Sequence, residues 1–327
     1  KNYLPEGMIP CCYPADFPSH EFIPNWALWY VLELVQYQQR NGTSPVVEHS
    51  KDNVRGILNY FKKLENELGL LENLQGWIFV EWSKANDEEF IRGVNFPTNM
   101  LYAEALMKAG ELLNEPPLIE EGKKKKQLIA QLAWNGEFFV DNAIRDESNR
   151  LVLTDHTTET CQYYAYFFDI LSKEDNPAFF KKMMNDFGET RDDKKVYPNV
   201  YKSNVLMGIM MRLTILNRNG YTDRVFEETV EYFYKMAKLT GTLWEHDSVF
   251  ASLNHCFTSN IVNLFLEANF GLQRIDYKNR VIHLSSHASL RDGEVSLPVG
   301  KEESLFLQAK EGELSVKEPA GYTLEWN

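Results

Sequence analysis

Aromatic side chains stand next to carboxylates at two places in this chain. One is the run WIFVEW at Trp77–Trp82, which contains Glu81; the other is the run GTLWE at Gly241–Glu245, which is followed by His246. Sugars present flat apolar ring faces and a rim of hydroxyl groups, which aromatic planes and nearby carboxylates match. Glycoside hydrolysis needs one carboxyl group as an acid and another as a base. Both runs therefore favour a carbohydrate site, although a Trp-Glu pair alone is more often a core aromatic beside a solvated acid.

Other candidate residues have plain structural readings. His255 directly precedes an apolar segment and can be a capping histidine, and 157–162 reads chiefly as a capped helix start. The sequence holds no Gly-x-Ser-x-Gly, His-Glu-x-x-His, P-loop or Gly-x-Gly-x-x-Gly motif, which weakens serine hydrolase, zinc protease and nucleotide-binding interpretations. Cys11 and Cys12 are adjacent, which suits neither a disulfide framework nor a zinc site. We expect no cofactor and no metal.

The elements that position these residues are mostly helices from about residue 24 to 270. The apolar spacing predicts about nine of them, at 25–38, 49–66, 102–113, 126–140, 158–171, 176–186, 204–216, 226–237 and 257–270. Two apolar stretches between them, Trp77–Val80 and Leu151–Leu153, are expected to be short strands. The basic run Lys123–Lys126 is expected to lie on the solvent side of a helix start.

After Gly271 the apolar residues alternate with polar ones, as in Val295, Leu297 and Val299. This period of two predicts a small antiparallel β-sandwich module with a structural role. We expect a helical domain over 1–271 and a β domain over 272–327. Many paired helices before a β module favour an (α/α)6 toroid, although a solenoid stays open. Six pairs make twelve helices, so we expect N-terminal helices to be missing from the chain.

Composition narrows the class of partner. The chain has 327 residues, and its 47 acidic groups outnumber 34 basic ones, giving a formal charge of −13. Nucleic acids and anionic membranes attract clustered Lys and Arg, so neither is expected as a partner. No stretch is long and apolar enough to cross a bilayer. We favour a periplasmic or secreted location over a cytoplasmic one, although four cysteines leave the redox compartment open.

The second aromatic-carboxylate run resembles a known family. Gly241–Glu245, followed by Ser252–His255 and an apolar helix ending at Gly271, is similar to segments of the bacterial α-L-rhamnosidases of glycoside hydrolase family 78. Members carry a Thr-Leu-Trp-Glu loop, then a Ser/Asn-His helix start and a closing glycine. This combination is the most specific part of the resemblance.

Weaker matches run in the same order along the chain. Pro5–Pro10 is similar to the family's Pro-acid-Gly-x-x-Pro turn, and Ile23–Trp26 looks like the loop that follows it. Trp77–Trp82 resembles the family's Phe-x-Asp-Trp loop, with Glu81 where Asp is usual. The β module resembles the family's C-terminal part.

The resemblance implies roles for individual residues. Glu245 would be the general base that activates water in an inverting hydrolysis of terminal α-L-rhamnosides. Trp26 and Trp82 would shape the pocket around the deoxy-sugar, together with Trp244 and Asn254. His255 would bond a sugar hydroxyl, and Glu81 would do the same with a reach altered by the exchange from Asp.

One departure concerns the general acid. In the family it lies in an Arg/Asp/Glu-rich segment upstream of the Pro-x-Gly turn, which here begins at Pro5. A displaced copy at Arg191-Asp192-Asp193 lacks the Gly-Trp partner. We therefore expect the acid, and additional N-terminal domains, upstream of residue 1. Two alternatives stay open: a non-catalytic rhamnose-binding or carbohydrate-binding member, and a glucoside-acting glycosidase or phosphorylase on the same toroid.

Overall fold

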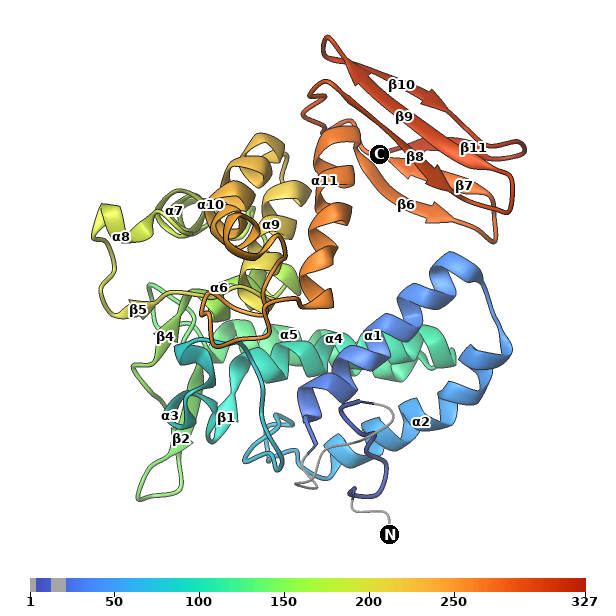
Figure 1. Cartoon of the computed structure of the whole chain (residues 1–327). Helices are drawn as coiled ribbons and strands as arrows, with labels where there is room; N and C mark the ends of the chain where they lie inside the picture. The colour runs from blue at the N-terminus through green and yellow to red at the C-terminus, as the bar shows by residue number, and fades with distance from the viewer. Residues whose placement is uncertain (1–3, 13–21) are drawn as a thin grey trace. The chain divides into compact units, whose positions relative to one another are not determined.

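Two compact units make up the chain. The computed structural model describes residues 4–12 and 22–327 (Figure 1). Unit 1 comprises residues 1–36 and 44–211, and unit 2 comprises residues 37–43 and 212–327. This division falls inside a helix at Met211, whereas the expected domain limits were 1–271 and 272–327. Those limits stay a prediction.

The helices of unit 1 begin where the sequence supplies caps. Ser44, Asn95, Thr158 and Asn176 each accept a hydrogen bond from a backbone N–H group three residues further on, which satisfies a donor that a helix start otherwise leaves unpaired. The helices are α1 (Pro24–Asn41), α2 (Pro45–Lys62), α3 (Glu88–Ile91), α4 (Phe96–Leu113), α5 (Pro116–Leu132), α6 (Glu159–Phe167), α7 (Pro177–Asp186) and α8 (Arg191–Lys194), with a 3-10 turn η1 at Lys84–Asn86.

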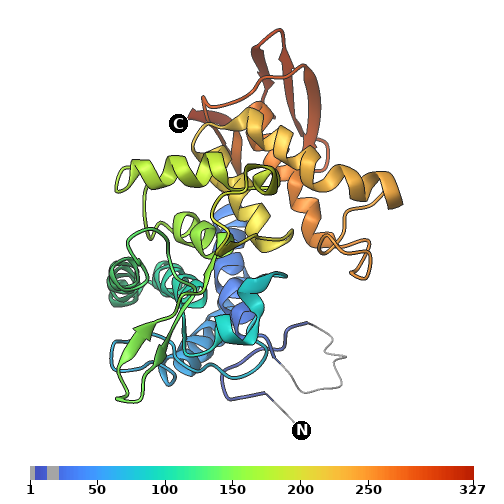
Figure 2. The same cartoon turned by 90° about the vertical axis from the view of Figure 1, so that its left-hand side faces the viewer.

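Helices α4 and α5 lie side by side in both views of the molecule (Figures 1 and 2). Helix α9 (Met207–Arg218) spans the division, and unit 2 continues with α10 (Thr222–Thr240), a 3-10 turn η2 (Cys256–Asn260) and α11 (Ile261–Phe270). Phe226 of α10 stacks on Phe265 of α11 with ring centroids 5.0 Å apart. None of the helices in the described residues is long and apolar enough to span a membrane.

All nine expected helices are present, but one is misplaced. The helix expected at 126–140 is α5, which begins ten residues earlier because Pro116 suits the first turn of a helix, where no N–H is needed. The lysine run therefore lies inside the helix. Because successive residues turn by about 100°, four in a row cannot all face solvent. Lys125 is only 5% exposed, and its Nζ lies 2.7 Å from Glu65. The expectation of a solvated face was wrong for this residue.

Short strands complete unit 1. β1 (Val94–Asn95), β2 (Asn142–Arg145) and β3 (Leu151–Leu153) form an antiparallel sheet in that order, and β4 (Thr157–Thr158) pairs parallel to β5 (Val200–Tyr201). The strand at Leu151–Leu153 is confirmed. The expected strand at Trp77–Val80 is absent. The N–H groups of Phe79 and Val80 donate to side-chain amides and not to a neighbouring strand.

The β part begins directly after α11, as the change of period predicts. Two three-stranded sheets form, β8–β9–β10 and β6–β7–β11, from β6 (Leu272–Asp276), β7 (Val281–Leu284), β8 (Gly293–Pro298), β9 (Ser304–Lys310), β10 (Glu313–Lys317) and β11 (Thr323–Trp326). Residues of both sheets share one apolar core that includes Ile282 and Leu305. The coarse prediction of helices followed by a β part is therefore confirmed.

One strand pair corrects the antiparallel prediction. β11 runs parallel to β7, with Leu324 opposite Ile282. Antiparallel neighbours are usually joined by a short hairpin, whereas these two strands are separated in the chain by the whole β8–β9–β10 sheet. No tight turn therefore fixes their relative direction.

Candidate functional site

The Trp77–Trp82 loop of unit 1 is held by side chains and not by a β ladder. Phe79 donates its N–H to Asn25 Oδ1 at 3.0 Å, and Val80 donates its N–H to Asn86 Oδ1 at 2.8 Å. Buried backbone groups need such partners when no strand supplies them. The amides thus fix an irregular backbone that presents its aromatic side chains.

Those aromatic side chains form a cluster with Trp26 of α1. Trp26 stacks on Phe79 at 5.8 Å and 13°, and Phe79 packs edge-on against Trp82 at 4.9 Å. Trp77 also contacts Trp82, at 5.8 Å. Trp26, Trp77 and Trp82 are each partly exposed. The structure therefore brings Trp26 and Trp82, expected to lie on one sugar pocket, into one aromatic cluster.

Glu81 has a different setting, because its side chain is completely buried. One carboxyl oxygen, Oε1, accepts the N–H of Trp82 at 2.8 Å. The other, Oε2, accepts the N–H of Gly208 and the hydroxyl of Ser203. Burial raises the pKa of Glu81 to about 8, although these donors each favour the ionised carboxylate. No part of Glu81 is accessible to a sugar in this conformation.

In unit 2 the loop after α10 carries Trp244 and Glu245. Helix α10 ends at Gly241, whose left-handed φ of 72° closes the helix with an N–H bond to Ala237. Trp244 is 1% exposed, and its Nε1 donates to Thr240 Oγ1 at 2.8 Å. The large buried indole therefore anchors the loop one residue before Glu245.

The same loop folds back on itself around Glu245. Glu245 donates its N–H to Ser252 O at 2.9 Å, and His255 donates its N–H to Leu243 O at 3.0 Å. The N–H of Ser252 in turn lies 3.4 Å from Glu245 Oε2. Glu245 is partly exposed, so a carboxylate with a backbone donor on one oxygen remains accessible to solvent.

Asn254 and His255 follow on the returning side of this loop. Asn254 is exposed and His255 is partly exposed. The Nδ1 atom of His255 is buried and has no hydrogen-bond partner within the described part of the chain. The expected site residues thus fall into two groups: Trp26, Glu81 and Trp82 in unit 1, and Trp244, Glu245, Asn254 and His255 in unit 2.

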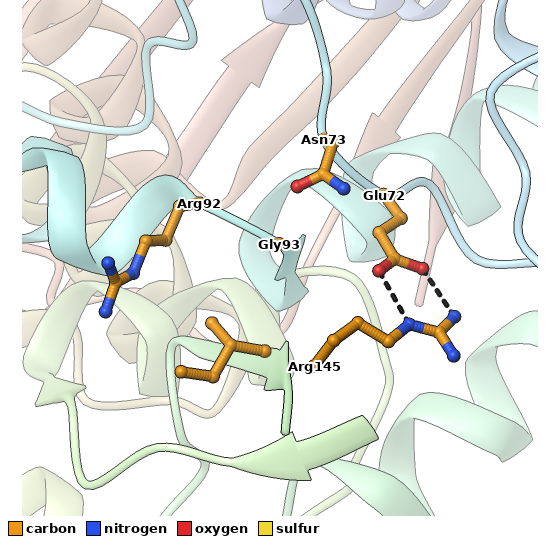
Figure 3. A pocket seen from close by; sticks show the side chains of 6 residues that line it. Glu72, Asn73, Arg92, Gly93 and Arg145 are labelled. Carbon is orange, nitrogen blue, oxygen red and sulfur yellow. Dashed lines mark hydrogen bonds and ion pairs between the residues drawn. The ribbon is translucent and has the colours of Figure 1, made fainter. Parts of the chain in front are cut away.

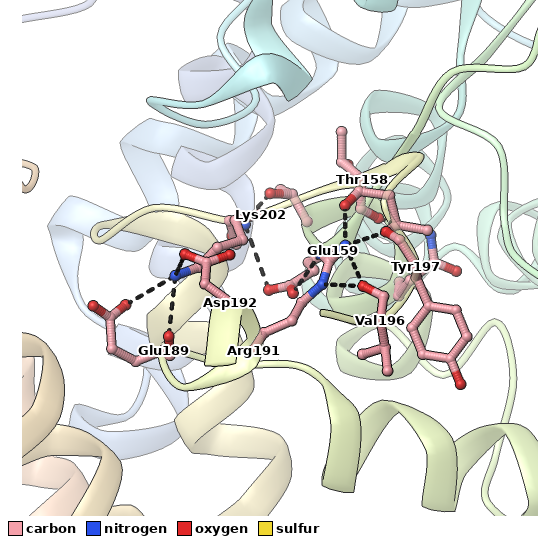
Figure 4. Close-up of polar contacts among 12 residues, drawn as sticks. Thr158, Glu159, Glu189, Arg191, Asp192, Val196, Tyr197 and Lys202 are labelled. Atoms are coloured by element: carbon pink, nitrogen blue, oxygen red, sulfur yellow. Dashed lines mark hydrogen bonds and ion pairs between the residues drawn. The ribbon is translucent and has the colours of Figure 1, made fainter. Parts of the chain in front are cut away.

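Sequence reasoning missed a buried polar network in unit 1 (Figure 4). Arg191 Nη1 donates to Glu159 Oε1 at 2.8 Å, and the side chains of both residues are at most 5% exposed. The Arg191 guanidinium also donates to the carbonyl groups of Val196, Tyr197 and Val200. Arg191 therefore connects the 196–200 loop to α6. Within the run Arg191-Asp192-Asp193, the arginine is buried and has a structural role.

Asp141 is a second buried acid that no motif pointed to. It is completely buried, and Thr158 Oγ1 donates to its Oδ1 at 2.8 Å. Its Oδ2 has no hydrogen-bond partner among residues 4–12 and 22–327. Burial raises the pKa of Asp141 to about 8. The only signal in the sequence was a lone Asp beside an apolar run, which is too common to single out.

A cavity of about 280 Å³ lies in unit 1, and none of the predicted site residues lines it (Figure 3). It is lined by Glu72, Asn73, Arg92, Gly93, Ile144 and Arg145. Arg145 bonds Glu72 at 2.7 and 2.9 Å, and hydrogen bonding from Arg145 lowers the pKa of Glu72. The one carboxylate that lines the cavity, Glu72, is thus held in an ion pair. Such a pair fits a structural role better than acid–base catalysis. Within the described residues no three His, Cys, Asp or Glu side chains are grouped to hold a metal ion.

Comparison with known proteins gives structural likeness without sequence likeness. No protein-family model matches the sequence, and no curated protein matches it. The GH78 family rhamnosidase of Bacillus sp. GL1 superimposes with a TM-score of 0.71 at 16% identity, covering 94% of this chain and 35% of that one. The alpha-L-rhamnosidase from Dictyoglumus thermophilum gives 0.70 at 14% identity, covering 99% and 37%.

A third solved structure, the rhamnosidase from Klebsiella oxytoca with rhamnose bound, gives a TM-score of 0.59 at 14% identity, covering 80% of this chain and 50% of that one. At such identities the likeness shows the fold. The chain therefore has a rhamnosidase-like fold of the GH78 type, and it spans between about a third and a half of the length of these solved structures.

Proposed function

We propose that a protein containing this chain is an inverting glycosidase that removes terminal α-L-rhamnose from rhamnosides. The observation that carries the proposal is the fold: two rhamnosidases match over 94% and 99% of the chain. The Thr-Leu-Trp-Glu sequence that resembles the family's base-carrying loop adds to it. The same likeness supports a complete (α/α)6 toroid in the whole protein, in which loops at helix ends gather around the substrate.

Glu245 is the proposed general base. A carboxylate base must be ionised, must reach a water molecule and must be held in one position. Glu245 is partly exposed, its Oε2 is 3.4 Å from the N–H of Ser252, and the preceding Trp244 is buried. Inversion requires the acid to lie about 6.5–9.5 Å from this base, with the water between the sugar and the base. The proposal assigns no residue of this chain to the acid.

Sugar-binding roles are proposed for residues of each unit. In unit 1, Trp26 and Trp82 offer partly exposed indole faces for the ring and the C6 methyl group of rhamnose. In unit 2, Asn254 and His255 offer polar groups for sugar hydroxyls from the loop that carries Glu245. Trp244 anchors that loop.

The test is the Glu245→Gln variant of the full-length protein. Gln keeps the size and one acceptor for the N–H of Ser252 but cannot take a proton, so turnover of an aryl α-L-rhamnoside should fall about 10²-fold to 10⁴-fold. Glu227→Gln, which neutralises an exposed acid on α10, serves as the matched control. Near-normal turnover in the Glu245→Gln variant would refute the assignment.

A substrate panel separates the alternatives. Hydrolysis of α-L-rhamnosides with release of the inverted β anomer, read by NMR in the first minutes, supports the proposal. Turnover of α-glucosides in place of rhamnosides would favour a glucoside-acting glycosidase. Rhamnose binding without turnover of either substrate by the full-length protein would favour a carbohydrate-binding module.

A further inference from the structure

The peptide groups on both sides of Trp82 are held by one short segment. Trp82 donates its N–H to Glu81 Oε1 at 2.8 Å, and its carbonyl oxygen accepts from Asn204 Nδ2 at 2.7 Å. Glu81 in turn bonds Ser203 and Gly208. The position of Trp82 thus depends on residues 203–208, which lie more than 120 positions further along the chain.

The carboxyl of Glu81 stands at the start of α9. Gly208 is the second residue of this helix of 12 residues, and its N–H donates to Glu81 Oε2. The first N–H groups of a helix have no partner within it, and a carboxyl oxygen that accepts one of them stabilises that end. Glu81 therefore does for α9 what a local capping residue does for α2, α4 and α6.

The contact is close enough to favour glycine at position 208. A Cβ atom added there would lie 1.6 Å from Ser203 Oγ and 2.8 Å from Glu81 Oε2. Both distances are shorter than real contacts, so a larger residue would require the side chains of Ser203 and Glu81 to shift. The buried carboxyl of Glu81 thus packs closely against Gly208 at the start of α9.

From this geometry we propose that Glu81 is a positioning residue, which fixes Trp82 in the aromatic cluster by bonding its N–H while capping α9. A direct contact of Glu81 with substrate is a poorer explanation, because the side chain has no exposed surface and both oxygens are engaged within the protein. The positioning of Trp82 stands on these contacts alone. Its use in holding a sugar rests on the function proposed above.

The experiment is ¹⁹F NMR of the full-length protein labelled with 5-fluorotryptophan. The Trp82→Phe variant identifies the Trp82 resonance by its disappearance. Glu81→Gln puts amide hydrogens where Gly208 or Trp82 needs an acceptor, so the Trp82 resonance should shift or broaden while that of Trp326, in the β part, does not. Glu147→Gln, at an exposed turn, is the matched control and should leave the Trp82 resonance in place.

Rhamnose affinity, measured by calorimetry on the same variants, gives the second readout. Because leaving a buried donor without its acceptor costs about 1–3 kcal/mol, we expect roughly 5-fold to 100-fold weaker binding in Glu81→Gln and no change in Glu147→Gln. An unmoved Trp82 resonance in folded Glu81→Gln protein overturns the proposal. So does a moved resonance with unchanged rhamnose affinity, if Trp82→Ala lowers that affinity.

Two further variants keep the outcome decisive. Should Glu81→Gln fail to fold, Glu81→Asp takes its place: it keeps the carboxyl group but is one methylene shorter, so an unmoved Trp82 resonance there overturns the proposal equally. Should Trp82→Ala leave rhamnose affinity unchanged, Trp82 does not hold the sugar and the proposed site is wrong. The Trp82 resonance in Glu81→Gln then decides the positioning role by itself.

Discussion

The buried acid Asp141 predicts how the stability of the protein depends on pH. Burial raises its pKa from 3.8 to about 8, whereas an aspartate in the unfolded chain titrates near 4. Between these values the folded protein holds a proton that the unfolded chain has released. Stability therefore declines as pH rises from about 4, and the decline levels off above about pH 8.

The size of the effect follows from the shift in pKa. Each unit of difference between the folded and unfolded states is worth about 1.4 kcal/mol, so Asp141 can lower the free energy of unfolding by roughly 5 kcal/mol between pH 4 and pH 8. Relaxation of the buried site makes this an upper bound. Asp141→Asn removes the titrating group. It can place an amide NH₂ group where Oδ2 lies, and Oδ2 has no hydrogen-bond partner in the described residues. That costs about 1–3 kcal/mol at any pH.

The assay is urea unfolding of wild type and Asp141→Asn at pH 5, 6, 7 and 8. At pH 5 we expect a lower free energy of unfolding for the variant than for wild type. The difference should shrink as pH rises, and by pH 8 the variant should be as stable as wild type or more stable. Thr158→Val removes a hydroxyl that bonds Asp141 Oδ1 and lowers its pKa, so the decline in stability should extend to higher pH. A difference between wild type and Asp141→Asn that stays constant from pH 5 to pH 8 would refute the reasoning.

Further predictions concern the other buried groups and the β part. Glu159→Gln leaves the Arg191 guanidinium buried without its anion and should cost about 3–5 kcal/mol in urea unfolding; a loss below about 1 kcal/mol would contradict this. Trp244→Ala empties the site of a fully buried indole and should cost about 3–5 kcal/mol, with Trp244→Phe costing less by the same assay. Glu294→Gln and Glu313→Gln should leave rhamnoside turnover unaltered, and a large loss would give the β part a role in catalysis.

Helix positions could be predicted because amphipathic spacing is a property of consecutive residues. α10, with its stripe of Phe226, Val230 and Phe233, appears where that stripe predicts a helix. The error at α5 arose because four lysines were taken for a solvated helix start. In the structure Lys125 is held inside by Glu65, which lies on another element 60 residues away. Tertiary ion pairs of this kind leave no local pattern.

The candidate site was predictable only where a short motif carries it. The run from Thr242 to Glu245 forms a folded-back loop, and the role of Glu245 as a base stays a prediction. For Glu81 the sequence indicated an acid beside aromatic residues but not its depth, because burial depends on Ser203 and Gly208, far along the chain. Neither periodicity nor composition can report such a contact.

The cap on α9 also has a consequence for synthesis on the ribosome. Glu81 and Gly208 are separated by 127 positions, and ribosomes add about 5–20 residues per second, so about 6–25 s pass between their translation. During this interval the Trp77–Trp82 loop has Asn25 and Trp26 as partners. It lacks Gly208, which bonds its acid, and Asn204, which bonds the carbonyl group of Trp82. This nascent segment is the part of the chain where we expect a chaperone to bind, and slower codons between the two positions would lengthen its exposure.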